Sequence, residues 1–253
     1  ADSAIISADT YLTAGGAVTF NSTVDGDAAS NDHDLTVDTA NTSTTFFNGV
    51  VGGTTANAIE SITTNADGET QIAANITTDG ASMSFNDPVV ITADVIITEL
   101  GAGDITFAQT VNGDGTPRAL TVNNPNNTFF TGPVGTLMSL GSVATDTGGT
   151  THIDGGFVTT SGTQTYGDNV ELGNAGLTTL IANAGNGNVT FEANVDASML
   201  GVETLLLDAN LVLGDAGADA IGGATAIGEL TVNGTSTFNS TANPTVVTTT
   251  MGG

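Results

Sequence analysis

The chain lacks cysteine, tryptophan and lysine, and it carries almost no positive charge. Its 253 residues include one basic side chain, Arg118, against 27 acidic ones, which gives a formal net charge of −26. Such a chain repels nucleic-acid phosphates and anionic membrane surfaces, so we expect neither as a partner. Without lysine, a Walker-type phosphate-binding loop is excluded. Divalent cations, basic proteins and neutral glycans remain as the partners that this charge permits.

Aromatic residues and long apolar runs are also scarce. Aromatic side chains make up 5% of the residues, although 39% are hydrophobic. No run approaches the roughly 18 apolar residues of a membrane-spanning helix, so no membrane insertion is expected. The lack of cysteine says nothing about export, because stacked coils bury their own core without disulfides. Glycine and β-branched residues occur throughout, which disfavours helices and favours short strands joined by tight turns.

What the sequence does contain is one pattern that occurs nearly three times. GAVTFNSTV at 16–24 returns as GDITFAQTV at 103–111 and as GNVTFEANV at 187–195. DLTVDTANTSTTFFNGVVG at 34–52 returns as ALTVNNPNNTFFTGPVG at 119–135. Self-similarity at a regular period indicates a stacked architecture rather than one unique globular core.

Within each copy the apolar residues alternate with polar ones. Val18 and Phe20 in the first copy correspond to Ile105 and Phe107 in the second. Period-two alternation places these side chains on one face of a strand, while Thr, Asn and Asp face outward. Each block therefore predicts a short strand followed by a turn. The apolar positions recur too regularly for a disordered chain.

The spacing between copies predicts a solenoid with loops of variable length. Phe20 and Phe107 are 87 residues apart, and Ile72 and Ile153 are 81 apart. We predict an all-β fold, a single right-handed parallel β-helix (β-solenoid) over 1–253. Its supra-repeats cover about 16–100, 103–185 and 187–250, and the third contains an extra coil at about 198–228. A β-sandwich and a propeller are the alternatives, but the insertion in the third copy would be awkward in a sandwich, and the blade motifs of a propeller are absent.

The repeated segments resemble a known family. The stretch GGTTHIDGGFVTTSGTQTYGDNVELG at 148–173, together with the TFF-x-G-x-VG units, looks like the repeats of very large filamentous-haemagglutinin-like exoproteins. The resemblance covers most of the chain. It implies a long right-handed parallel β-helix that bacteria secrete across the outer membrane, in a family whose members are commonly adhesins or surface filaments. It implies adhesion less directly, because such repeats usually form the shaft.

The residues give little support to an enzyme. β-Helical polysaccharide lyases need a strong base, but the one candidate, Arg118, lies in a turn, where it is expected to be a solvated charge or a partner of Asp114. A glycosidase needs two carboxyl groups about 5–9.5 Å apart, one of them with a raised pKa. Among 27 acidic residues some pair meets that distance by chance. No nucleophile elbow appears either. We therefore predict no enzymatic activity.

Calcium is the one cofactor that the sequence suggests, and none is required. Hard cations prefer clustered oxygen ligands in Gly-rich turns. Segment 214–221 partly matches the nonapeptide of Ca²⁺-binding β-rolls, but it occurs once, and solvated acidic turns are the alternative. His33 and His152 belong to different copies and do not form a zinc site. The candidate ligands are Asp25, Asp27, Asp32 and Asp34 in the first turn, and Asp215 and Asp219 in the second.

These observations together predict a structural or adhesive role. We expect a segment of a secreted fibre at the bacterial cell surface, outside the cell, which stacks end to end with further repeats or with identical subunits. Host or cell-surface glycans are candidate ligands. The alternative is a β-helix that binds or cleaves carbohydrate.

Overall fold

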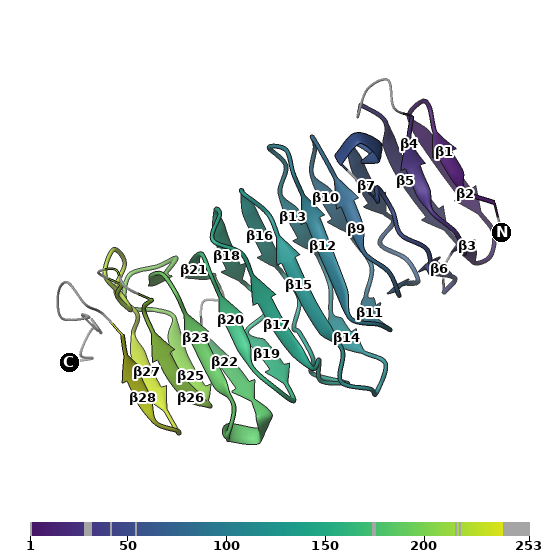
Figure 1. Ribbon diagram of the computed structural model, residues 1–253. Helices are drawn as coiled ribbons and strands as arrows, with labels where there is room; N and C mark the ends of the chain where they lie inside the picture. The colour runs from purple at the N-terminus through teal and green to yellow at the C-terminus, as the bar shows by residue number, and fades with distance from the viewer. Residues whose placement is uncertain are drawn as a thin grey trace.

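The computed structural model describes residues 2–27, 32–40, 42–53, 55–173, 176–215, 217 and 219–239. The chain forms a β-solenoid of about ten turns, which runs from the purple N-terminal strands to the yellow C-terminal ones (Figure 1). Every strand pair in these ranges is parallel. The 3₁₀ turns η1 (Thr55–Asn57) and η2 (Asn183–Gly185) interrupt the strands. The predicted all-β solenoid is confirmed.

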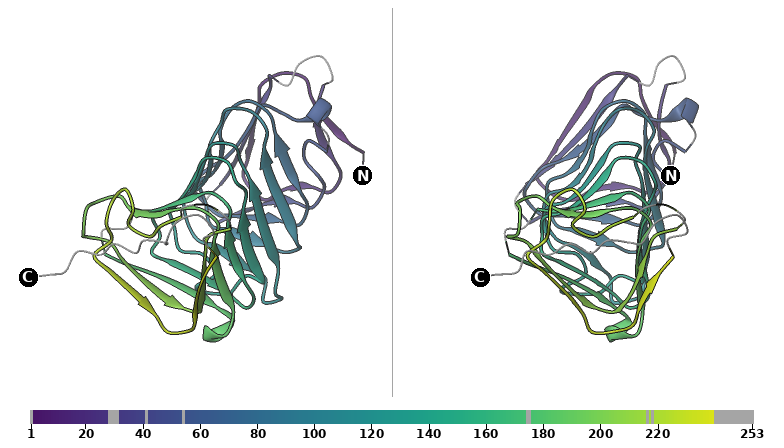
Figure 2. Two further views of the ribbon diagram at one scale, coloured as in Figure 1. Left: turned by 60° about the vertical axis from the view of Figure 1, so that its left-hand side comes forward. Right: turned by 90° about the vertical axis from the view of Figure 1, so that its left-hand side faces the viewer.

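The strands stack into three faces, which we name A, B and C. We call each strand, and each of the single bridge residues Val51, Val134 and Ile221, a strand position. Successive strand positions along the chain lie on face A, then B, then C, so three positions make one turn. Figure 2 shows these turns one behind another. Single-residue bridges at Val51 on face A and Val134 on face C join the sheet segments on either side.

Within each face, the strands stack in the order in which they occur along the chain. Face A contains β1 (Ala4–Ile6), β4 (Val24–Gly26), β9 (Ile76–Thr78), β12 (Val95–Glu99), β15 (Ala119–Asn123), β17 (Ser142–Thr145), β20 (Gln164–Tyr166), β23 (Asn188–Phe191), β26 (Asn210–Leu213) and β28 (Ser236–Phe238). Face B contains β2 (Thr10–Ala14), β5 (Asp34–Thr39), β7 (Ser61–Thr64), β10 (Met83–Phe85), β13 (Ile105–Phe107), β16 (Asn127–Phe130), β18 (Thr150–Ile153), β21 (Asn169–Leu172) and β24 (Val195–Ala197). Face C contains β3 (Val18–Phe20), β6 (Thr44–Phe47), β8 (Glu69–Ile72), β11 (Val89–Ile91), β14 (Val111–Gly113), β19 (Phe157–Thr160), β22 (Leu177–Ala182), β25 (Thr204–Asp208) and β27 (Glu229–Val232).

The core lies inside the coil, where alternate side chains of each strand point. In β13 the buried residues are Ile105 and Phe107, with Thr106 between them facing outward. Inward side chains stack on their counterparts in the next turn, and the rings of Phe107 and Phe130 lie 5.3 Å apart. Stacking therefore turns the period-two pattern of each strand into continuous apolar columns along the axis.

One such column, apolar except for Thr145, follows face A for the full length of the described stack. The strand registers place its members directly above one another. It begins at Ala4 and ends at Phe238, whose side chain is 50% exposed. The members are Ala4, Val24, Val51, Ile76, Ile97, Val122, Thr145, Tyr166, Phe191, Leu213 and Phe238.

Equivalent residues of the three copies lie on different faces. Phe20 belongs to β3 on face C, Phe107 to β13 on face B, and Phe191 to β23 on face A. With the bridge residues counted as strand positions, Phe107 lies eleven positions after Phe20, and Phe191 lies eleven positions after Phe107. Because a turn has three positions, eleven is one short of four turns. Each copy is therefore rotated by one face relative to the copy before it.

Strand counting also offers another alignment of the third copy. Segment 198–228 contains β25, β26 and the bridge residue Ile221, which together occupy all three faces once. The eleven-position period pairs β25 with β15, whereas the extra coil predicted at 198–228 would pair β27 with β15. The extra coil at 198–228 stays a prediction, since the strand positions admit both alignments.

Candidate functional site

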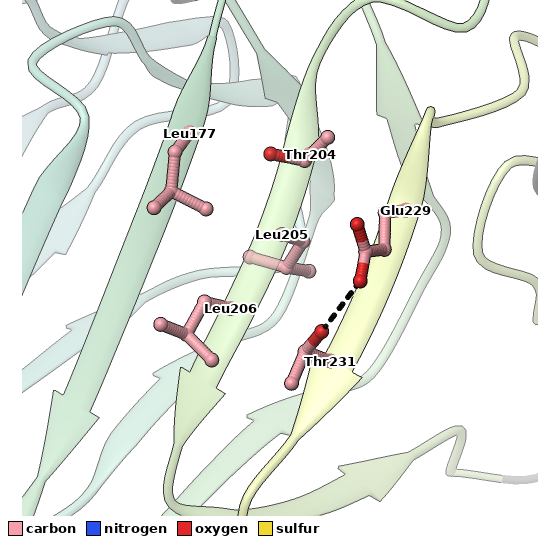
Figure 3. A pocket seen from close by; sticks show the side chains of 6 residues that line it. All are labelled: Leu177, Thr204, Leu205, Leu206, Glu229 and Thr231. Atoms are coloured by element: carbon pink, nitrogen blue, oxygen red, sulfur yellow. Dashed lines mark hydrogen bonds between the residues drawn. The ribbon is translucent and has the colours of Figure 1, made fainter. Parts of the chain in front are cut away.

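A shallow groove crosses the outer side of face C near the C-terminal end. Its volume is about 380 Å³. Leu177, Thr204 and Glu229 lie side by side in register across β22, β25 and β27. Glu229 Oε1 accepts a hydrogen bond of 3.2 Å from Thr231 Oγ1, as drawn in Figure 3. The lining residues are Leu177, Thr204, Leu205, Leu206, Glu229 and Thr231.

The groove combines an apolar wall with a few polar groups. Leu177 is 47% exposed, and the carboxylate of Glu229 accepts the hydrogen bond from the Thr231 hydroxyl. Glu229 is the ionisable residue of this lining, whereas glycoside hydrolysis requires a pair of carboxyl groups. The groove therefore combines an exposed leucine with the hydrogen-bonding groups of threonine and glutamate side chains.

The first predicted calcium turn is held by several separate contacts. Asp25 Oδ1 accepts a 3.3 Å hydrogen bond from the backbone N–H of Gly53. Asp34 Oδ1 accepts one of 2.5 Å from the Ser61 hydroxyl. The Nε2 of His33 lies 3.7 Å from Asp27 Oδ1. Two of the four carboxylates are thus engaged with backbone or hydroxyl donors of the next turn.

The other groups of this turn differ in their exposure to solvent. The Nδ1 of His33 lies 3.6 Å from Asp32 Oδ1, and the Asp32 side chain is 66% exposed. Asp27 Oδ1 has no hydrogen-bond partner. Neighbouring Glu60 has a pKa above its usual value, first because of burial and then because of the charges of Asp34 and Asp32. This end of the solenoid is therefore strongly acidic.

The second predicted turn contains Asp215 and Asp219. Asp215 is exposed, and Asp219 Oδ2 has no hydrogen-bond partner. Within the described ranges, no group of three or more His, Asp or Glu side chains has an arrangement that could hold a metal ion. The calcium prediction stays a prediction.

The remaining charged residues named from the sequence have structural partners. Arg118 Nη2 lies 3.1 Å from Asp114 Oδ2, which confirms the predicted pair. The hydrogen bond from Arg118 lowers the pKa of Asp114. His152 faces outward on face B, where its ring stacks on Phe129 at 4.4 Å and its Nδ1 lies 3.3 Å from Glu171 Oε1.

Three equivalent polar residues anchor loops that project from the solenoid. Asp196 Oδ1 accepts hydrogen bonds from the N–H groups of Ala224 at 2.8 Å and Thr225 at 3.0 Å. Asn112 Oδ1 accepts the N–H of Leu137 at 3.0 Å, as Asp25 accepts that of Gly53. The loops follow Val51, Val134 and Ile221, and begin at glycines with φ of 60°, 70° and 70°. Sequence analysis missed this role, although the shared V-[DN]-[GA] pattern at 24–26, 111–113 and 195–197 marks it.

Carboxylates inside the solenoid were also missed. Asp168 is 3% exposed and Asp87 is fully buried. Burial is the main cause that raises the pKa of both, to about 6 for Asp168, while hydrogen bonds from Thr151 and Thr145 pull the pKa of Asp168 down. These groups lie at corners of the core, where they accept hydrogen bonds from threonines of the preceding turn.

The fold and these contacts define the class of protein: the chain is a β-solenoid repeat protein with an acidic surface. The described residues contain no helix with the length and apolar character needed to cross a membrane. Comparison with protein-family models, with curated proteins and with solved structures finds no match.

Proposed function

We propose that the chain is a non-catalytic structural segment of a secreted bacterial surface fibre. The observation that carries this proposal is the continuous column from Ala4 to Phe238, which runs through every turn without a break. A stack in which each turn contacts its neighbours suits a shaft, because stability grows with each added turn. The resemblance to filamentous-haemagglutinin-like repeats points the same way.

The open ends of the stack support the same proposal. In the described part of the chain, β1, β2 and β3 have a strand on one side only, and so do β27 and β28. Unpaired strand edges readily accept further strands. Additional repeats or identical subunits would cover these edges and continue the fibre. Extracellular location follows from this role and from the resemblance.

Immunogold labelling of the source cells tests the proposal. An antibody raised against the purified chain should label extracellular fibres along their length. Label confined to the interior of the cell would contradict the proposal. An antibody against a cytosolic protein of the same cells is the control.

The groove on face C favours a second candidate function, the binding of a neutral glycan. Leu177 offers an apolar surface, and Glu229 and Thr231 offer hydrogen-bonding groups beside it. A glycan array should then show binding that Leu177→Asp and Glu229→Gln reduce, with Phe157→Asp on the same face as the control. Release of reducing sugar by the unmodified chain would overturn the non-catalytic role.

A further inference from the structure

The outer side of face A carries a regular array of small, uncharged side chains. From β15 to β28, six strands lie side by side in one continuous register (Figure 1). One outward residue of each strand lies beside that of the next, which gives a column parallel to the axis. Its members are Thr121, Ala144, Thr165, Thr190, Val212 and Thr237. The residues two positions earlier in the chain form a second outward column of Ala, Ser, Thr and Asn. We call the two columns together the outer array.

The outer array is free of charge, although the chain has 27 acidic residues. The other two faces carry charges in the same turns, since His152 and Glu171 project from face B and Glu229 projects from face C. Asp146 and Glu192 follow β17 and β23 and lie at the corner where the chain leaves face A. Charge is therefore absent from the outer array while the surface around it remains acidic.

The threonine hydroxyls of the outer array are available to solvent. Among the described residues, the hydroxyls of Thr121, Thr165 and Thr190 have no hydrogen-bond partner. The inward Thr145 differs, because its hydroxyl donates to Asp168 at 2.9 Å. A β-branched side chain has few χ1 rotamers, so the strand backbone fixes where each hydroxyl and methyl group points. The outer array therefore presents pre-oriented hydroxyl and methyl groups at regular intervals.

Strand geometry sets those intervals. Neighbouring members of a column lie about 4.8 Å apart along the axis, and the two columns lie about 6.7 Å apart across it. Both spacings are close to repeats of the oxygen lattice of ice. We propose that the outer array of face A binds the surface of ice crystals. This inference goes beyond the proposed shaft function and does not depend on it.

The chemistry of the outer array fits an ordered layer of water. Methyl groups restrict the orientations of the water molecules beside them, and the hydroxyls hold water by hydrogen bonds. Val212 keeps the branched shape of threonine within the column, and Ala144 leaves a smaller side chain there. An ice face has no net charge, so contact with it desolvates no ion of the array.

Other partners fit the outer array less well. A protein partner of opposite charge would need ionisable groups, which the array lacks. A polysaccharide would need aromatic rings on which sugar rings stack, and no aromatic side chain belongs to either column. A grid of equal intervals is instead complementary to a crystalline surface with matching intervals.

Thermal hysteresis and retention in growing ice test the proposal. The purified chain should lower the freezing point below the melting point, and slowly growing ice should incorporate it, although ice excludes ordinary solutes. Thr165→Tyr places a bulky ring in the middle of the outer array and should abolish both effects. Thr106→Tyr makes the same change on the outside of face B and should leave both effects intact. Strands tolerate exposed aromatic residues, and equal melting temperatures would show that both variants fold.

A second variant tests the array by a gain of activity. Ala144→Thr supplies the missing hydroxyl and methyl group in the threonine column, so it should increase the hysteresis at equal protein concentration. Such an increase cannot come from a folding defect. No change, or a decrease at an unaltered melting temperature, would contradict the role of the column.

Each remaining outcome decides against the proposal. Exclusion of the native chain from ice, without hysteresis, would overturn it. Equal losses from Thr165→Tyr and Thr106→Tyr would show that the outer array is not the site. Retention on cellulose or chitin powder that Thr165→Tyr alone removes, without hysteresis, would assign the array to a crystalline polysaccharide instead. Fibre labelling on the source cells tests the shaft separately, so these results leave that proposal standing.

Discussion

Asp87 and Asp168 accept equivalent hydrogen bonds at different corners of the solenoid. Thr64 and Thr70 donate to Asp87 at 2.7 Å and 2.9 Å, and Thr145 and Thr151 donate to Asp168 at 2.9 Å and 2.8 Å. Asp87 lies between faces B and C, and Asp168 between faces A and B. In both cases the carboxylate joins its own turn to the preceding one. The pair shows at the atomic level that the copies are rotated by one face.

The buried carboxylate of Asp168 predicts that the protein is more stable in mildly acidic solution. Its pKa in the folded protein is about 6, mainly because of burial, against 3.8 for a free aspartate. Between these values the folded state keeps a proton that the unfolded state has lost, so stability falls as pH rises from about 4 to about 6. The contribution of Asp168 to the free energy of unfolding changes by about 3 kcal/mol across this pH range.

Asp168→Asn should therefore raise the melting temperature at pH 7 and change it little at pH 4. The amide oxygen can still accept from Thr145 and Thr151, and it carries no charge to bury. Thermal melts from pH 4 to pH 7.5 measure the effect. Exposed Asp67→Asn controls for the loss of one surface charge. Parallel pH curves for the native chain and the Asp168 variant would refute the prediction.

The anchored loop at 135–139 should depend on Asn112. Asn112→Leu leaves the N–H groups of Leu137 and Met138 without their acceptor, at a cost of about 1–3 kcal/mol. We expect faster proteolysis within this loop and a lower urea midpoint. Asn112→Asp is the matched control, because Asp25 and Asp196 perform the same role in the other copies. Equal damage from both substitutions would mean that the acceptor is not what matters.

A glycine at the start of the same loop should be irreplaceable for a steric reason. Gly135 has φ of 70°, and a Cβ placed there would lie 2.1 Å from the Thr159 carbonyl oxygen. Gly115 has φ of 92° but open space around its Cα. Both alanine substitutions strain the backbone, by about 1–2 kcal/mol. Only Gly135→Ala also forces two turns apart, so its loss of stability in urea should clearly exceed that of Gly115→Ala. Equal losses would show that the close approach is unimportant.

The strands were predictable from the sequence because their signal is local. Ile105 and Phe107 alternate with Thr106, and the stacked core requires that alternation in every strand. The rotation between copies was not predictable in the same way. It depends on counting strand positions, and Val51, Val134 and Ile221 each hold a position with a single bridge residue. One residue does not produce a periodic pattern.

The polar contacts were hidden because their partners come from another turn. Asp168 is followed by Asn169 after a glycine, a combination typical of exposed turns. Its actual donors, Thr145 and Thr151, precede it by 23 and 17 residues. The sequence analysis instead looked for the densest cluster of acidic residues, which is the turn around Asp25 and Asp32. Density measures charge, but burial between stacked turns decides which carboxylates hold the fold together.

Calcium remains testable at the acidic turn that the sequence selected. Asp27 Oδ1 has no hydrogen-bond partner, and His33 lies near both Asp27 and Asp32. If Ca²⁺ binds there, 1 mM Ca²⁺ raises the melting temperature, because a ligand that binds the folded state alone stabilises it. Asp27→Asn should reduce this shift, whereas Asp219→Asn should leave it unchanged unless the second turn binds as well. Sodium chloride at equal ionic strength controls for screening of the net charge of −26. An identical shift with sodium chloride, or no shift with calcium, would mean that this turn does not bind calcium.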